Sequence, residues 1–152
     1  MSETLEQRFG DLQLAYPASW EVETLHDMNG LLLVDPQIEN DWQASVLFEL
    51  LRDEEGRSLE VAMADLCAAQ QEEHAGFFLR RQELREHLPG HPYGLIEFDS
   101  LTDGMALTQW LILLPTSGRE RLFVTAASER SLWEKYEPVF DAVMSSIRPA
   151  GS

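Results

Sequence analysis

The chain has 152 residues, with 27 acidic and 11 basic side chains and a formal net charge of −16 at pH 7. This length is typical of one domain that folds without a metal or disulfide, and the single cysteine excludes both an internal disulfide and a zinc site built from several cysteines. The acidic balance argues against nucleic acid and against an anionic membrane surface as partners, because both attract basic proteins.

The first third of the chain has the pattern of short β-strands. Apolar residues alternate with polar or small ones, as on a strand with one buried side. Pro17, Ala18 and Ser19 interrupt the alternation, and Asn29-Gly30 is typical of a turn. The expected strands cover residues 12–16, 20–25, 31–34 and 44–51.

A helix is expected to begin at Ser58, a good N-cap, and to end near Gly76. A meander of four strands follows, with a strong hairpin signal at Asp103-Gly104. Ser131 and Glu134 have the spacing of a capping box and predict a second helix, with a kink or a new start near Pro138. The strands expected between the helices cover residues 77–86, 93–101, 105–114 and 119–127.

The order of strands, helix, strands and helix, joined by tight turns, predicts an α+β fold with an antiparallel sheet rather than a parallel one. Residues 1–150 are expected to form a single domain, and residues 151–152 are read as a cloning remnant. The first residues have no basic region followed by an apolar core, so a cytoplasmic location is expected.

Residues 9–22 resemble the opening of the PsbP-like superfamily, a strand, Tyr-Pro-x-x-Trp and a second strand, here with Tyr16, Pro17 and Trp20. That superfamily unites the photosystem protein PsbP, a Ran-binding import factor of the Mog type and bacterial DcrB-like proteins. The resemblance extends to the order of elements over nearly the whole chain. It implies an αβα sandwich, in which helices cover both faces of an antiparallel sheet, and a protein that binds other proteins without catalysis. Some bacterial relatives are chaperones or adaptors for type VI secretion effectors, and their usual Leu-Pro-x-x-Trp opening differs from this one at Tyr16.

Aromatic residues are candidates for structural or binding roles. Tyr16, Pro17 and Trp20 are expected to form a bend that buries the indole, with a ligand-facing corner as the alternative. Trp42 lies in a polar loop, where burial under the loop competes with a hot spot for protein binding. Trp133 stands beside the apolar stripe of the last helix and is expected to widen it.

Reactive side chains are sparse, and we find no catalytic motif. His87 and His91 flank a turn and, with Glu83 or Glu86, are a weak metal candidate without a recognised ligand spacing. Cys67 is expected to be a core or boundary residue rather than a nucleophile. Ser117-Gly118 lacks the nucleophile elbow, and no phosphate-binding glycine motif occurs. No cofactor is therefore expected.

Acidic runs are the other candidate binding feature. Asp53, Glu54 and Glu55 form one run, and Glu72 and Glu73 form another. Such runs can steer a basic protein toward the surface, although a solvated surface that keeps the protein soluble is the simpler interpretation.

The sequence thus favours a non-enzymatic protein-binding domain, with a homodimeric state left open. The first hypothesis is an adaptor or chaperone of a bacterial secretion system that holds a secreted effector on an apolar sheet face rimmed with acidic residues. The alternative is an immunity or inhibitor protein that caps a basic toxin by charge complementarity. A small enzyme with an unrecognised site is the third.

Overall fold

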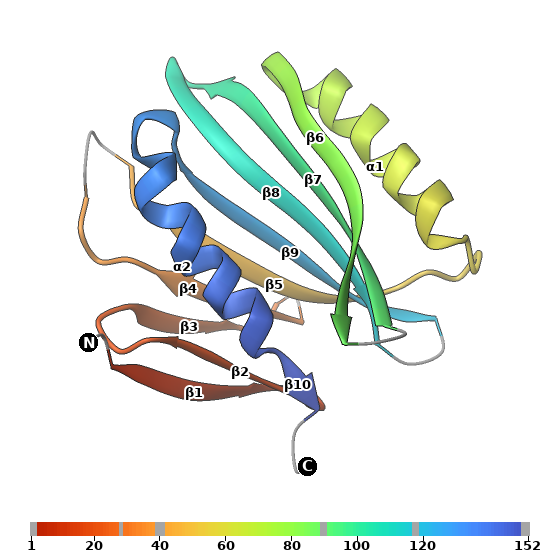
Figure 1. Cartoon of the computed structure of the whole chain (residues 1–152), viewed down its shortest axis with the longest axis horizontal. Coiled ribbons are helices and arrows are strands. Elements are labelled where there is room, and N and C mark those ends of the chain that lie inside the picture. Colours follow the sequence, from red (N-terminus) through yellow and green to blue (C-terminus); the bar gives the residue numbers. More distant parts are fainter. Residues whose placement is uncertain (1–2, 28, 39–41, 89–90, 117–118, 150–152) are drawn as a thin grey trace.

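The computed structural model describes residues 3–27, 29–38, 42–88, 91–116 and 119–149, without the side chains of residues 87, 88 and 91. Its described part contains two sheets and two long helices (Figure 1). In chain order the elements are β1 (Thr4–Phe9), β2 (Leu12–Pro17), β3 (Glu21–Leu25), β4 (Gly30–Val34), β5 (Ser45–Arg52), α1 (Leu59–Glu73), β6 (Ala75–Leu88), β7 (His91–Thr102), β8 (Met105–Pro115), β9 (Glu120–Glu129), the 3-10 turn η1 (Arg130–Leu132), α2 (Trp133–Ser146) and β10 (Arg148–Pro149).

The larger sheet has the strand order β3-β4-β5-β9-β8-β7-β6, and every pair in it is antiparallel. The hairpin between β7 and β8 turns at Asp103 and Gly104, which have φ of 51° and 80°. Two successive positive φ angles are what a two-residue hairpin of this twist requires. The predicted α+β class with antiparallel strands is therefore confirmed.

The N-terminal strands form a separate sheet, in the order β1-β2-β10. We expected one sheet and no strand before Leu12, so both the division and β1 are additions to the prediction. The chain leaves β2 in a turn in which the Trp20 N–H donates to the Pro17 carbonyl at 2.9 Å. The C-terminal β10 then pairs with Leu12 and Gln13, so the C-terminal strand lies beside the N-terminal hairpin, at the end of β2 opposite to the chain's start (Figure 1).

The two helices begin differently. In α1 the Ser58 hydroxyl accepts the Val61 N–H at 3.2 Å, so the predicted N-cap is confirmed. The predicted capping box of Ser131 is wrong, because a 3-10 turn precedes α2 and the Ser131 hydroxyl donates to the Glu129 carboxylate at 3.0 Å. The helix continues as one element through Pro138, so the new start is also wrong.

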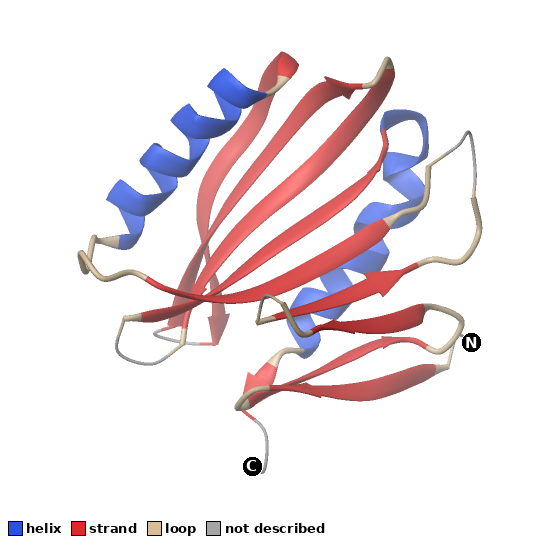
Figure 2. Cartoon of the chain, turned by 180° about the vertical axis from the view of Figure 1, so that it is seen from behind, coloured by secondary structure: helices blue, strands red, loops and turns tan. Residues whose placement is uncertain are grey.

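The helices pack against opposite faces of the larger sheet. On β7 and β8, Leu95 and Trp110 belong to the core under α2, whereas Ile96 and Leu111 belong to the core under α1. Successive side chains of a strand point to opposite faces, so this alternation separates the two cores. Helix α1, however, lies mainly over β6, β7 and β8 and meets β9 at Phe123, and β4 and most of β5 have no helix in front of them on that side (Figure 2). The predicted sandwich with helices covering both faces is therefore not confirmed.

Candidate protein-binding face

The part of the α1 side of the sheet that lies beyond the helix presents apolar side chains. Leu32 of β4 pairs with Leu47 of β5, which pairs with Thr125 of β9, so their side chains lie on one face. Leu51 and Phe123 lie on the same face further along their strands. We call this surface, together with the adjacent loop residues Ile38 and Trp42, the open face.

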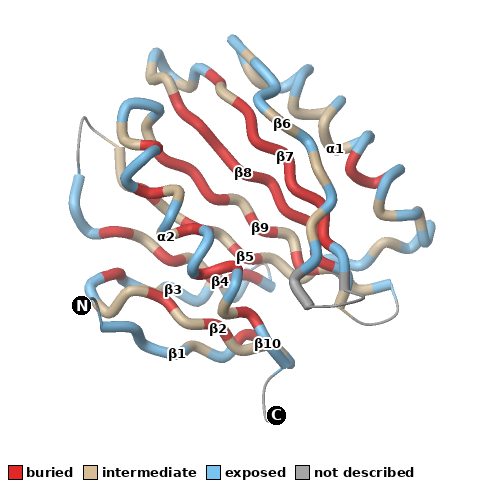
Figure 3. Tube along the Cα trace, viewed as in Figure 1, coloured by how far each residue is buried: buried red, intermediate tan, exposed pale blue. Residues whose placement is uncertain are grey.

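Exposure distinguishes the open face from the other side of the same strands. The side chains that point toward α2, such as Phe48 and Val124, are fully buried. Those of Leu32, Leu47 and Phe123 are only half-buried, and the alternation is visible along the chain in Figure 3. On the open face, β5 presents the apolar Leu47 and Leu51 together with the polar Ser45 and Glu49, so this face is only partly apolar, whereas the opposite face is packed under α2.

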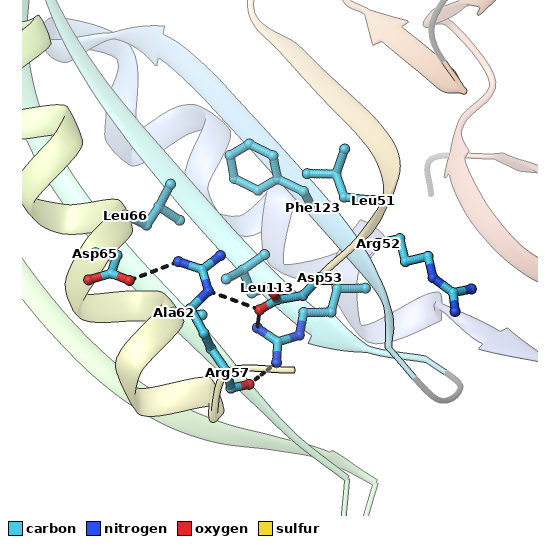
Figure 4. Close-up of a pocket in the computed structure, with 10 residues that line it drawn as sticks. Leu51, Arg52, Asp53, Arg57, Ala62, Asp65, Leu66, Leu113 and Phe123 are labelled. Atoms are coloured by element: carbon cyan, nitrogen blue, oxygen red, sulfur yellow. Dashed lines mark hydrogen bonds and ion pairs between the residues drawn. The ribbon is translucent and has the colours of Figure 1, made fainter. Parts of the chain in front are cut away.

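Two hollows lie on the open face. The first has a volume of about 280 Å³ between α1 and strands β5 and β9, with Leu51, Leu66 and Phe123 among its apolar side chains (Figure 4). The second, of about 360 Å³, is lined by Leu32, Ile38, Trp42, Gln43 and Ser45. Ser45 and Leu51 are six residues apart on β5, so the hollows are separated by roughly 20 Å.

Charged side chains form the rim of the first hollow. The Asp53 carboxylate accepts from Arg57 at 3.0 Å and pairs with Arg121 at 3.3 Å, and Arg57 also reaches Asp65 at 2.8 Å (Figure 4). Burial acts to raise the pKa of Asp53, but the Arg57 hydrogen bond, the Glu55 backbone N–H and the charges of Arg57 and Arg121 outweigh it. The pKa of Asp53 is therefore lowered, and its carboxylate is held by partners within the chain.

The predicted acidic residues lie at opposite ends of α1. Glu54 and Glu55 are exposed in the loop before the helix, and Glu72 and Glu73 are exposed in its last turn. A helix of 15 residues is about 22 Å long, so the two groups do not form one patch. Of the predicted acidic residues, only Asp53 lines a hollow of the open face.

Trp42 lies at the second hollow. Its side chain is half-buried, and its indole N–H is buried without an acceptor among the described residues. Trp133 has a different role, because it is buried against Trp110 at a ring distance of 5.7 Å.

The Tyr16, Pro17 and Trp20 motif lies on the other side of the sheet, against α2. Tyr16 and Trp20 are buried, and the Trp20 ring meets the edges of Tyr136 and Phe140 at 6.2 and 6.4 Å. The three motif residues also line a cavity with α2, the kind of place that the alternative expectation of a ligand-facing corner described.

The remaining chemical candidates are not brought together. The side chains of His87 and His91, and residues Ser117 and Gly118, lie outside the described residues. Within the described part, no three histidine, cysteine or acidic side chains are grouped for a metal ion. Burial raises the pKa of the Cys67 thiol, which keeps it protonated and a poor nucleophile at pH 7.

No helix in the described ranges is long and apolar enough to cross a membrane.

Comparison with known proteins finds similarity in structure only. No family model matches the chain, and no curated protein matches it in sequence. Among solved structures, the protein PA94 of Pseudomonas aeruginosa, of unknown function, has a TM-score of 0.72 at 15% identity, covering 99% of both chains.

Two further structures bear on the predicted family. The cyanobacterial PsbP of Synechocystis has a TM-score of 0.73 at 14% identity over 98% of this chain and 94% of its own. The Ran-binding protein Mog1p of Saccharomyces cerevisiae has a TM-score of 0.68 at 7% identity over 98% and 96%. Identities this low establish the fold alone. The resemblance inferred from Tyr16, Pro17 and Trp20 is confirmed at that level: the chain has the fold of the PsbP-like superfamily.

Proposed function

We propose that the chain is a non-catalytic adaptor or chaperone that holds an apolar segment of another protein on the open face. The carrying observation is the pair of half-buried apolar side chains Leu32 of β4 and Leu47 of β5, which lie beyond α1, with Phe123 of β9 at the edge of the helix. Exposed apolar patches of this kind are typical of interaction sites. The shared fold of Mog1p, a Ran-binding protein, supports protein binding as the activity.

The chemistry of the open face also suits such a client. Apolar side chains supply the contact area, while the rim of Asp53, Arg57 and Asp65 offers charges of both signs to the ends of a bound segment. A secreted effector of a type VI system, held in the cytoplasm before export, is the client that this proposal favours. A homodimer stays open.

Binding of a lysine-flanked leucine–alanine peptide, measured by calorimetry, tests the proposal. Ile38 and Leu51 are 66% and 43% exposed on the open face, so Ile38→Asp with Leu51→Asp disturbs the fold little. Each lost apolar contact is worth about 1.5 kcal/mol, and the double variant should bind about 100-fold more weakly. Val61→Asp is the matched control, because Val61 is 50% exposed on α1 and lines neither hollow. Equal binding by the two variants would refute the open face as the site.

The alternative is an immunity protein that caps a basic toxin. The net charge of −16 and the exposed Glu54, Glu55, Glu72 and Glu73 favour it. Pull-down from the native host followed by mass spectrometry identifies the partner. The salt dependence of binding to that partner then distinguishes the two proposed functions. Binding to exposed carboxylates should collapse as the screening length falls from about 10 Å at 0.1 M salt to about 3 Å at 1 M, whereas binding to the open face should persist.

A further inference from the structure

A cavity of about 420 Å³ lies on the α2 side of the larger sheet, away from the open face. Its walls include Tyr16, Pro17 and Trp20 of the N-terminal motif together with Tyr136 and Val139 of α2. Small-molecule sites in proteins have volumes of about 300–1,000 Å³ and walls that are largely apolar. We call this space the α2 cavity.

One wall of the α2 cavity carries a buried carboxylate. Asp35, which follows β4, is 8% exposed and lines the cavity. Its Oδ2 accepts from the Tyr136 hydroxyl at 2.6 Å and its Oδ1 accepts from the Gln37 backbone N–H at 3.0 Å. Both donors are neutral, and no basic side chain within the described ranges forms an ion pair with Asp35.

Buried carboxylates in proteins are usually paired with a cation, because neutral donors compensate only part of their lost hydration. An ionised carboxylate has about four acceptor positions, and the two bonds to Asp35 use two of them. Counted over the described residues, the carboxylate thus has acceptor positions left for a cationic group.

The aromatic walls suit the same type of ligand. The Trp20 and Tyr136 rings are 6.2 Å apart at an angle of 70°, and Tyr16 joins them in the lining. Aromatic faces attract ammonium and guanidinium groups. Lys135 already shows this at the Tyr136 ring, where its ammonium lies 5.1 Å from the ring centroid.

We propose that the α2 cavity binds an ammonium group on an apolar stem, with the ammonium at Asp35 and the stem against Tyr16 and Trp20. Lys135 is exposed, so its charge opposes the ligand from the solvent side and is partly screened. The inference is independent of the proposed function, because the cavity and the open face share no residue.

The test is an NMR titration of the full chain that follows the Trp20 indole N–H. The probes are 2-phenylethylamine, a cation at pH 7, and 2-phenylethanol, its neutral counterpart of similar shape. The amine should bind about tenfold more tightly than the alcohol, or more. Equal affinities, or no shift of Trp20 by either probe, would overturn the proposal.

Two variants separate charge from shape. Asp35→Asn keeps an oxygen for the Tyr136 hydroxyl but removes the charge, so the amine should bind no better than the alcohol. Lys135→Gln, at an exposed position that leaves the core intact, should tighten the amine and leave the alcohol unchanged. Asp103→Asn, at the exposed turn between β7 and β8, is the control and should change neither affinity. If the amine binds the Asp35→Asn variant as tightly as the wild type, the carboxylate has no role. If Asp35→Asn fails to fold, Lys135→Gln still tests whether charge at the cavity controls the affinity for the amine.

A further probe distinguishes two sources of the ammonium. N-acetyl-lysine methylamide presents the group as a protein side chain would. If it shifts Trp20 with the same dependence on Asp35, the cavity accepts a lysine of a partner protein; if only 2-phenylethylamine does so, the cavity accepts a free amine.

Discussion

The buried carboxylate of Glu97 on β7 offers a direct measure of what one hydrogen bond contributes to this fold. Glu97 is 6% exposed, and its Oε1 accepts the Trp110 indole N–H at 2.7 Å. Arg81 and Arg80 approach the same carboxylate at 3.1 and 3.5 Å. Glu97→Gln keeps an oxygen for the indole N–H and removes the charge, whereas Glu97→Leu removes both.

The two variants should differ in the free energy of unfolding. The side chains of Arg80 and Arg81 are 38% and 34% exposed, so they rehydrate when the charge is lost, and Glu97→Gln should cost about 1 kcal/mol. Trp110 is 1% exposed, so Glu97→Leu also leaves a buried N–H without an acceptor. That penalty is about 1–3 kcal/mol, and Glu97→Leu should be less stable than Glu97→Gln by this amount.

Urea unfolding at pH 7, followed by tryptophan fluorescence, measures the difference. Trp110→Phe supplies the control, because it removes the indole N–H. Without this donor, an acceptor at position 97 has no hydrogen bond to make with residue 110. The gap between the Gln and Leu variants should then shrink toward zero in the Trp110→Phe background. A Leu variant as stable as the Gln variant in the native background would show that the indole hydrogen bond contributes nothing net.

Two further predictions concern α1 and its N-terminal loop. A Cβ at Gly94 would lie 2.5 Å from Met63, which is 2% exposed, so Gly94→Ala should destabilise the fold by about 1–3 kcal/mol in thermal or urea unfolding, and Met63→Ala in the same chain should reduce this penalty. The pKa of Asp53 is lowered in the folded state, so the folded protein binds a proton at this carboxylate less readily than the unfolded chain does. The ionised carboxylate therefore stabilises the fold at pH values above its ordinary pKa of about 4. This contribution is lost as the pH falls through the lowered pKa. The urea midpoint of Asp53→Asn should therefore lie below that of the wild type at pH 7 and approach it near pH 2, and a gap that does not change with pH would contradict this.

Local signals in the sequence predicted most of the elements. Ser58 marks a helix start because its hydroxyl satisfies a free N–H of the first turn, and Asp103-Gly104 marks a hairpin because these residues tolerate positive φ. Strand β1 gave no such signal, because nearly all its side chains are exposed or half-buried and its pairing with β2 holds it in place. Ser131 gave a signal that the structure does not follow. Its spacing to Glu134 fits a capping box, but the chain forms a 3-10 turn there instead.

The binding surface was predicted only in part. Trp42 and Asp53 were named from the sequence and lie at the two hollows of the open face. Leu47 and Phe123 were placed on strands, but β5 carries leucines on both of its faces, and no local pattern tells which face a helix will cover. Glu72 and Glu73 were grouped with Asp53 by charge, and α1 separates them.

The residues by themselves determined the α+β class and the antiparallel strands, because these follow from periodicity, turns and caps that act within a few positions. The fold family was indicated by the resemblance of the Tyr16, Pro17 and Trp20 opening. Only the tertiary structure decided where α1 settles, since it packs closely where Gly94 leaves room for Met63 and leaves β4 and most of β5 uncovered. The hydrogen bond between Asp35 and Tyr136, which are 101 positions apart, was likewise decided only by the tertiary structure. Packing between distant segments depends on the shape of the whole core, and no short stretch of sequence records it.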